Sequence, residues 1–177
     1  MTATAPILSE EDARAITCFD ALMWALSRPG LTRDLPEPGM VCVVEALLDR
    51  ECAAYADDPE LARAIARSGA VRATPDQADH VFAKGVTPDM LRQLRQGSDL
   101  HPEEGATLIT QARIGQGTRL RLTGPGIDGA VEIALDLPPE TWPLRADLMR
   151  YPTGFEIFVI DGARVVGLPR STAVEVL

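Results

Sequence analysis

The chain has 177 residues, of which 46% are hydrophobic and 24% are charged, an ordinary composition for one globular domain with a sizeable core. Its formal net charge of −9 and its sequence pI near 4.7 exclude the broad basic surface that nucleic-acid binding needs. No apolar run is long enough to cross a bilayer, and the N-terminus lacks the pattern of a secretory signal. We therefore expect a single cytoplasmic domain over residues 1–177, without membrane contact.

Helix signals dominate the first half of the chain. Ser9 precedes three acidic residues, a typical helix start, and apolar residues then recur at helical spacing until Pro29-Gly30 ends the pattern. Residues 41–55 predict a second helix, although their VCVV start fits a strand equally well. Short helices are expected after Asp58-Pro59 and Thr87-Pro88, and they end near Gly69 and Gly97. The apolar positions that make the first helix amphipathic are Ile16, Phe19, Met23 and Leu26.

Strand signals follow in the second half, with one further helix expected within residues 138–150, after their prolines. Asp161-Gly162 is a strong hairpin signal between two apolar runs. The run 155–160 is apolar on both faces apart from Glu156, so its sheet needs cover on both sides. The sequence therefore predicts an α/β fold in three layers, with a mixed sheet flanked by helices. The expected strands are residues 80–83, 107–114, 118–123, 130–135, 155–160 and 164–168.

Reactive side chains are few and scattered. Cys18, Cys42 and Cys52 lack metal-ligand spacing and are expected to be reduced thiols in or near the core. His80 opens an apolar segment and fits a core histidine, whereas His101 fits an exposed loop better than a general base. No Ser-His-Asp or Cys-His order has a supporting motif. The sequence therefore predicts no catalytic residue and no metal site.

Five residues are candidates for contact with an anion or a partner. Arg119 and Arg121 project from the same face of a strand, which fits a solvated or salt-bridged face better than an anion site. Gly124 and Gly126 could let the backbone approach a phosphate, but the Gly-Lys-Ser/Thr of a P-loop is absent and a glycine-shaped connection between strands is favoured. Arg170 follows a proline and precedes two hydroxyl residues. It is a candidate phosphate or partner contact, with structural hydrogen bonding as the favoured alternative.

Five sequence blocks stand out when they are taken in order. They are FDALMWALSRPG (19–30), EGATLI (104–109), LTGPGI (122–127), YPTG (151–154) and LPRST (168–172). Together they resemble the PhnH-type subunit of the bacterial carbon–phosphorus lyase system, and the resemblance extends from residue 19 to the C-terminus. Two blocks depart slightly from the family's usual forms, since YPTG replaces Phe-Pro-Leu-Gly and PRST replaces Pro-Arg-Thr-Thr.

The resemblance implies a fold like that of the pyridoxal-phosphate-dependent transferases, but without the cofactor. A pyridoxal enzyme of this type needs a lysine for its Schiff base. Lys84 is the sole lysine among the seventeen basic residues, and no motif around it suggests that role. We therefore expect neither pyridoxal phosphate nor any other cofactor on this chain.

The resemblance also implies a part in organophosphonate catabolism, at the step in which a phosphonate displaces adenine from ATP. The product of that step is α-D-ribose 1-methylphosphonate 5-triphosphate when methylphosphonate reacts. The expected role is an essential, noncatalytic subunit that docks on the other lyase subunits and forms a homodimer in isolation. Two alternatives stay open. In the first, a triphosphate or phosphonate in a shared active site is held by Arg119, Arg121 or Arg170. In the second, the chain is an unrelated small-molecule enzyme on this scaffold.

Overall fold

Two β-sheets and five α-helices make up the computed structural model, which describes residues 8–177. The helices are α1 (Glu10–Ser27), α2 (Val41–Leu47), α3 (Pro59–Ser68), α4 (Pro88–Gln93) and α5 (Thr141–Leu148), and Pro102–Glu104 form a 3₁₀ turn. The strands are β1 (Arg33–Asp34), β2 (Ala53–Ala56), β3 (Val71–Arg72), β4 (His80–Ala83), β5 (Thr107–Gln111), β6 (Ile114–Thr123), β7 (Val131–Leu135), β8 (Glu156–Asp161), β9 (Arg164–Leu168) and β10 (Ala173–Val176).

The larger sheet is mixed and has seven strands in the order β1-β9-β8-β5-β4-β2-β3. The strands from β3 to β8 in that order run parallel to one another, whereas β9 is antiparallel to both β8 and β1. The smaller sheet is antiparallel, with the order β10-β6-β7. The predicted α/β class with a mixed sheet is therefore confirmed.

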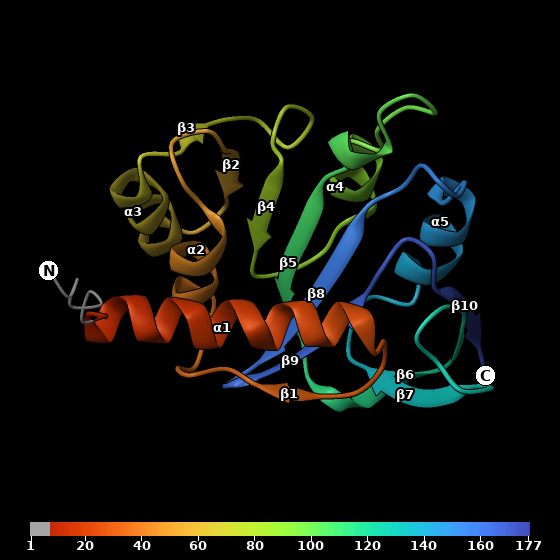
Figure 1. The fold of residues 1–177 in the computed structure, drawn as a ribbon. Coiled ribbons are helices and arrows are strands. Elements are labelled where there is room, and N and C mark those ends of the chain that lie inside the picture. The colour runs from red at the N-terminus through yellow and green to blue at the C-terminus, as the bar shows by residue number, and fades with distance from the viewer. Residues whose placement is uncertain (1–7) are drawn as a thin grey trace, which may run out of the picture.

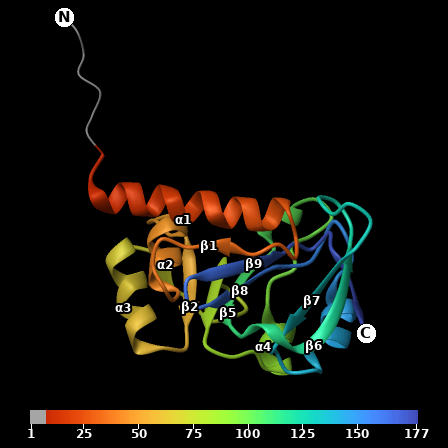
Figure 2. The same cartoon turned by 90° about the horizontal axis from the view of Figure 1, so that it is seen from below.

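Both faces of the larger sheet are covered (Figures 1 and 2). Helix α1 crosses one face, where α2 and α3 also pack, and α4 lies on the opposite side together with α5 and the smaller sheet. Successive residues of a central strand point to opposite faces, so Phe158 packs under α1 and Val159 packs toward α5. The apolar run of β8 thus has the two-sided cover that its sequence predicts.

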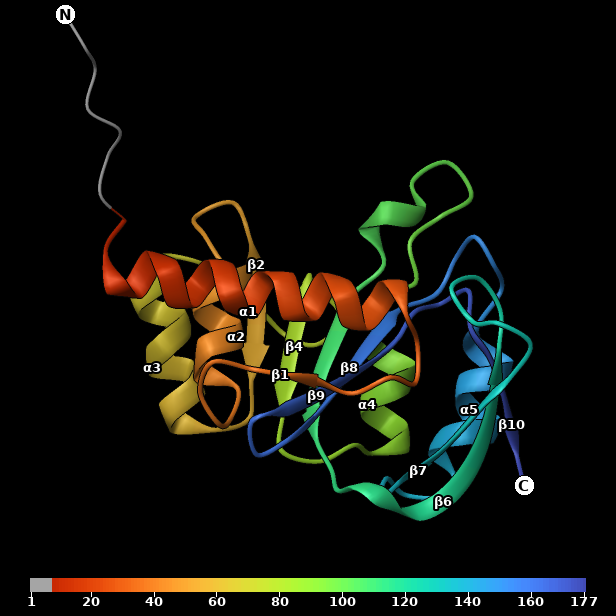
Figure 3. The same ribbon diagram turned by 60° about the horizontal axis from the view of Figure 1, so that its bottom comes forward.

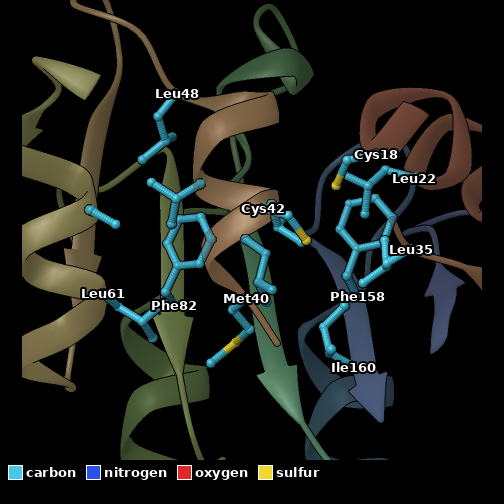
Figure 4. Packing of buried hydrophobic residues seen from close by; sticks show 14 of the residues in the cluster. Cys18, Leu22, Leu35, Met40, Cys42, Leu48, Leu61, Phe82, Phe158 and Ile160 are labelled. Atoms are coloured by element: carbon cyan, nitrogen blue, oxygen red, sulfur yellow. The ribbon is translucent and has the colours of Figure 1, made fainter. Parts of the chain in front are cut away.

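The core beneath α1 and α2 is built from aliphatic side chains, phenylalanines and thiols (Figure 4). Phe82 and Phe158 are fully buried there, and each contributes roughly 1.5–3 kcal/mol relative to an exposed side chain. Cys18 and Cys42 lie in the same cluster as free thiols, and Cys52 is half-buried at its margin. The predicted core or near-core placement of the three cysteines is confirmed.

Helix α1 begins where the sequence predicts, but the predicted apolar positions are mostly exposed. Ser9 accepts a hydrogen bond from the Asp12 backbone N–H at 3.0 Å, and the Asp12 carboxylate accepts one from the Ser9 N–H at 3.3 Å, which completes a capping box. Small residues form most of the inner face, because the helix lies close to the sheet it crosses (Figure 3). The buried positions are Cys18, Ala21, Leu22 and Ala25, whereas Ile16, Phe19 and Met23 are exposed.

Helix α3, strand β4 and the β8–β9 hairpin follow the sequence closely. Asp58 accepts hydrogen bonds from the first turn of α3, and Gly69 ends that helix with a φ of 85°. Gly162 takes a φ of 61° in the turn of the hairpin. These elements carry strong local signals, so their positions are predictable without tertiary contacts.

Other boundaries differ from the prediction. Residues 41–55 hold a helix that ends at Leu47 and then strand β2, rather than one long helix. Strand β5 ends at Gln111, and Ile114 begins β6, which continues through a bulge before Thr118. Helix α4 stops at Gln93, four residues before Gly97, and α5 occupies only the centre of the predicted segment.

Four strands had no strand prediction: β2, which lies within the predicted second helix, and β1, β3 and β10. β1 and β3 have only two residues each, too few for a periodic pattern, and β10 is a short edge strand of the smaller sheet.

Within residues 8–177, no helix combines the length and apolar character needed to cross a membrane.

Candidate functional site

The five candidate residues lie in three different parts of the structure. Arg119 and Arg121 are on β6, at the exposed face of the smaller sheet. Gly124 and Gly126 are in the loop between β6 and β7, and Arg170 is in the turn between β9 and β10. The fold does not gather all five into one site, although Gly124 lies against Ser171 in the turn that holds Arg170.

The two arginines of β6 lie beside carboxylates. Arg119 Nη2 lies 3.1 Å from Glu132 Oε2, and the two side chains are 69% and 60% exposed. Arg121 faces Glu132 on β7 and Glu175 on β10 in the strand register. Leu120, between the two arginines, is fully buried. This alternation is the solvated, salt-bridged face that the sequence favours, although Arg119 also lines a hollow of about 660 Å³ with Glu132.

The glycine loop packs against backbone carbonyl groups. Gly124 has a φ of 136°, and a Cβ there would lie 2.8 Å from the Ser171 carbonyl oxygen. Gly126 has a φ of 81°, and a Cβ there would meet the Ser27 carbonyl oxygen at the end of α1. Both glycines are thus explained by backbone conformation and close approach. Carbonyl oxygens in these positions would repel an anion, so the geometry favours a strand connection.

Arg170 connects three segments through hydrogen bonds. Its Nε donates to Glu156 Oε1 at 2.6 Å, and its backbone N–H donates to Oε2 of the same carboxylate at 2.6 Å. Its Nη1 donates to the carbonyl oxygens of Pro102 and, at 3.4 Å, of Pro152. The Arg170 and Glu156 side chains are only 15% and 17% exposed. Structural hydrogen bonding, the favoured alternative for Arg170, is therefore present.

A second arginine of this region has no sequence prediction. Arg145 on α5 is 2% exposed, and it donates to Thr172 O at 3.1 Å and to Pro169 O at 2.9 Å. Burial lowers the pKa of Arg145 to about 10, so the guanidinium remains charged at neutral pH. A signal was available in the sequence, since Arg145 follows the buried Trp142 at helical spacing and therefore belongs to the inner face of α5.

Arg145 and Arg170 line one hollow of about 300 Å³ between α5 and the β9–β10 turn. Ser171 and Thr172 belong to the same wall, and Thr172 Oγ1 is buried without a hydrogen-bond partner. The remainder of the wall is mostly apolar: Ala146, Met149, Tyr151, Ala173 and Val174. This hollow is the candidate functional site, because it is lined both by Arg170, a predicted anion contact, and by the buried, charged Arg145.

The histidines are far less suited to chemistry. His101 is exposed, and its Nδ1 lies 3.1 Å from Glu103 Oε1. His80 is half-buried at the start of β4, where its buried Nδ1 has no partner in the described structure and burial lowers its pKa. In the described part of the chain, no group of three or more His, Cys, Asp or Glu side chains could hold a metal ion.

Comparison with known proteins places the chain in a family. The family model described as "Bacterial phosphonate metabolism protein (PhnH)" matches residues 8–175. The chain is also 34% identical over 173 residues to HtxG of Stutzerimonas stutzeri, whose name provisionally assigns it as a C-P lyase subunit protein. That alignment covers 90% of this chain and 85% of HtxG. The chain therefore belongs to the PhnH family of bacterial phosphonate metabolism proteins.

Proposed function

We propose that this chain is a subunit of a bacterial carbon–phosphorus lyase system. In that system it takes part in the step in which a phosphonate displaces adenine from the ribose of ATP, with α-D-ribose 1-methylphosphonate 5-triphosphate as the product from methylphosphonate. The observation that carries the proposal is the family match over residues 8–175, together with the relative provisionally assigned as a lyase subunit.

The proposed role is noncatalytic. Its support is that, within residues 8–177, neither histidine side chain is hydrogen-bonded to a Ser, Thr, Cys or Lys side chain. Acid–base or nucleophilic catalysis needs its groups within hydrogen-bond reach of one another. The chain then acts by contact with the other lyase subunits. The exposed apolar residues Ile16, Phe19 and Met23 of α1 fit such a role, because partner proteins commonly cover surfaces of this kind.

The fold is proposed to resemble that of the pyridoxal-phosphate-dependent transferases, without the cofactor. Lys84 Nζ lies 2.5 Å from Asp58 Oδ2, and this carboxylate raises the pKa of the ammonium group. A Schiff base forms from a neutral amine, so the surroundings of Lys84 oppose that chemistry. An aldimine absorbance in the purified protein, lost in Lys84→Ala, would contradict the proposal.

Co-expression with the other lyase subunits of the same genome tests the subunit role. Native mass spectrometry should detect this chain in the assembly, and the complete assembly should release adenine from ATP only when a phosphonate is present. We expect that release to be lost when the chain is omitted and absent from the isolated chain. Assembly and full turnover of the other subunits without this chain would overturn the proposal.

The same measurement separates the alternatives. Native mass spectrometry of the isolated chain reports whether it forms the expected homodimer. Phosphonate-dependent adenine release by the chain alone would favour a catalytic role. Turnover of an unrelated substrate by the chain, with no incorporation into the assembly, would favour a separate small-molecule enzyme.

A further inference from the structure

The hollow between α5 and the β9–β10 turn differs in charge from other hollows of the surface. Arg145 and Arg170 line it, whereas no Asp or Glu side chain from residues 8–177 does so. Four other hollows each include at least one carboxylate: Glu132, Asp128, Asp136 with Asp161, and Glu11 with Glu45. In a chain with a formal net charge of −9, this hollow is a local exception. Its field attracts anions rather than cations.

Arg170 is paired with the Glu156 carboxylate, whereas Arg145 has no carboxylate within hydrogen-bond distance. Glu156 accepts two hydrogen bonds of 2.6 Å from Arg170, which occupy both of its oxygens. Arg145 donates only to the carbonyl oxygens of Pro169 and Thr172, which are polar but carry no net charge. The buried charge of Arg145 is therefore met by backbone dipoles alone, without a hydrogen-bonded carboxylate. Buried charges are costly unless they are paired, so an anion in the hollow would stabilise this arrangement.

Hydrogen-bond capacity also remains on two of the residues that line the hollow. Arg145 Nε and Thr172 Oγ1 are buried and have no partner in the described structure. Buried polar atoms are paired in the great majority of cases, so two unpaired atoms at one place require an explanation. Hydroxyl and guanidinium groups are donors, and the oxygens of an oxyanion accept from several donors at once.

The volume of the hollow limits the size of the ligand. At about 300 Å³ it lies at the lower end of the range for small-molecule sites, roughly 300–1,000 Å³. Ala146, Met149 and Val174 supply an apolar portion of the wall. A single oxyanion with a small organic substituent fits these dimensions better than a whole nucleotide.

We propose that this hollow binds a tetrahedral phosphorus oxyanion, carried as a phosphonate or as a phosphate. Arg145 and Arg170 supply the compensating charge, and the hydroxyl groups of Ser171 and Thr172 supply hydrogen bonds. The choice of phosphorus rests on the proposed function, whereas the preference for an anion follows from the charges of the wall.

The test places a negative charge at the hollow without disturbing the buried network. Ala146 is exposed on α5 and lines the hollow, so Ala146→Glu should repel an anion while the protein still folds. Ala66→Glu is a matched control, because Ala66 is exposed on α3 and is likewise third from the end of its helix. Arg145→Met would be a more direct change, but it leaves two carbonyl groups unpaired and risks unfolding the chain.

Methylphosphonate, inorganic phosphate and acetate are titrated into each purified protein by calorimetry at low salt. We expect saturable binding of methylphosphonate or phosphate to the wild-type chain and to Ala66→Glu, with affinity at least about tenfold lower in Ala146→Glu. Tighter binding of methylphosphonate would identify a phosphonate as the ligand, and tighter binding of phosphate would identify a phosphate.

Three results would overturn the inference: no saturable binding of either phosphorus anion, equal affinity in Ala146→Glu, or acetate binding as tight as that of methylphosphonate. The wild-type chain is assayed in parallel for assembly with the other lyase subunits. Assembly without anion binding would refute only this inference. Anion binding without assembly would refute the subunit role and leave the anion site in place.

Discussion

Arg170 holds Glu156 through both its side chain and its backbone, with Nε 2.6 Å from Oε1 and the backbone nitrogen 2.6 Å from Oε2. Glu156 is the first residue of β8, and Arg170 lies two residues beyond the end of β9. This contact fixes the β9–β10 turn to the start of a central strand. Because Arg170 also donates to the Pro102 carbonyl, the turn is joined to the segment that precedes β5.

We expect Glu156→Gln to destabilise the protein by about 2 kcal/mol, because the part-buried Arg170 would lose its hydrogen-bonded carboxylate. Urea unfolding measures the change. The control is Glu132→Gln, which breaks the exposed pair with Arg119 and should cost under about 0.5 kcal/mol. Equal losses in the two variants would show that the Glu156 contact has no special structural role.

Gly126→Ala should destabilise the chain by about 3 kcal/mol. The substitution combines an unfavourable left-handed backbone conformation with a clash against the Ser27 carbonyl. Gly129→Ala separates the two causes, because Gly129 has a φ of 69° but a Cβ there would have nothing within 4 Å. For this variant we expect the free energy of unfolding to fall by about 1 kcal/mol. Thermal unfolding of both variants gives the comparison. If Gly129→Ala destabilised the protein as much as Gly126→Ala, the clash with α1 would not explain the effect of Gly126→Ala.

Stability should decrease as the pH falls from 7.5 to 5.5, because burial lowers the pKa of His80 in the folded state. The unfolded chain takes up a proton at this histidine below about pH 6.5, whereas the folded chain resists it. The unfolded state then binds more protons, so the free energy of unfolding falls with pH, by at most about 1.4 kcal/mol per pH unit.

Urea unfolding at several pH values tests this dependence in His80→Gln and in the matched variant His101→Gln. The slope should be largely lost in the first variant and kept in the second, whose histidine is exposed. A slope that survives His80→Gln would assign the dependence to another group.

In the folded protein, Cys52 should react with a thiol reagent before Cys18 and Cys42, because it alone of the three is not buried. Burial raises the pKa of Cys52, so even this reaction should be slow at neutral pH. Mass spectrometry of the alkylated chain identifies the modified residue, and Cys52→Ser should abolish the early modification. In denaturant all three thiols should react. Early modification of Cys18 would indicate that α1 opens readily.

The elements predicted well from the sequence are those with strong local signals. Asp58-Pro59 begins α3, Gly69 ends it, and Asp161-Gly162 forms a hairpin turn. For α1 the capping sequence gave the start, but the choice of the buried face was wrong. Ile16, Phe19 and Met23 lie outward, and apart from Leu22 the inner face consists of small residues where the helix crosses the sheet.

By itself, the sequence determined the fold class, the main helices and strands, and the family to which the chain belongs. Each of these depends on local periodicity, turn chemistry or motif order, which a linear chain displays directly. Only the tertiary structure decided that Arg145 and Arg170, twenty-five positions apart, line the same hollow. That proximity arises from the packing of α5 against the β9–β10 turn. There the buried Arg145 donates hydrogen bonds to the carbonyl oxygens of Pro169 and Thr172. A sequence pattern records charge and spacing, but it does not record which charged residues line the same hollow.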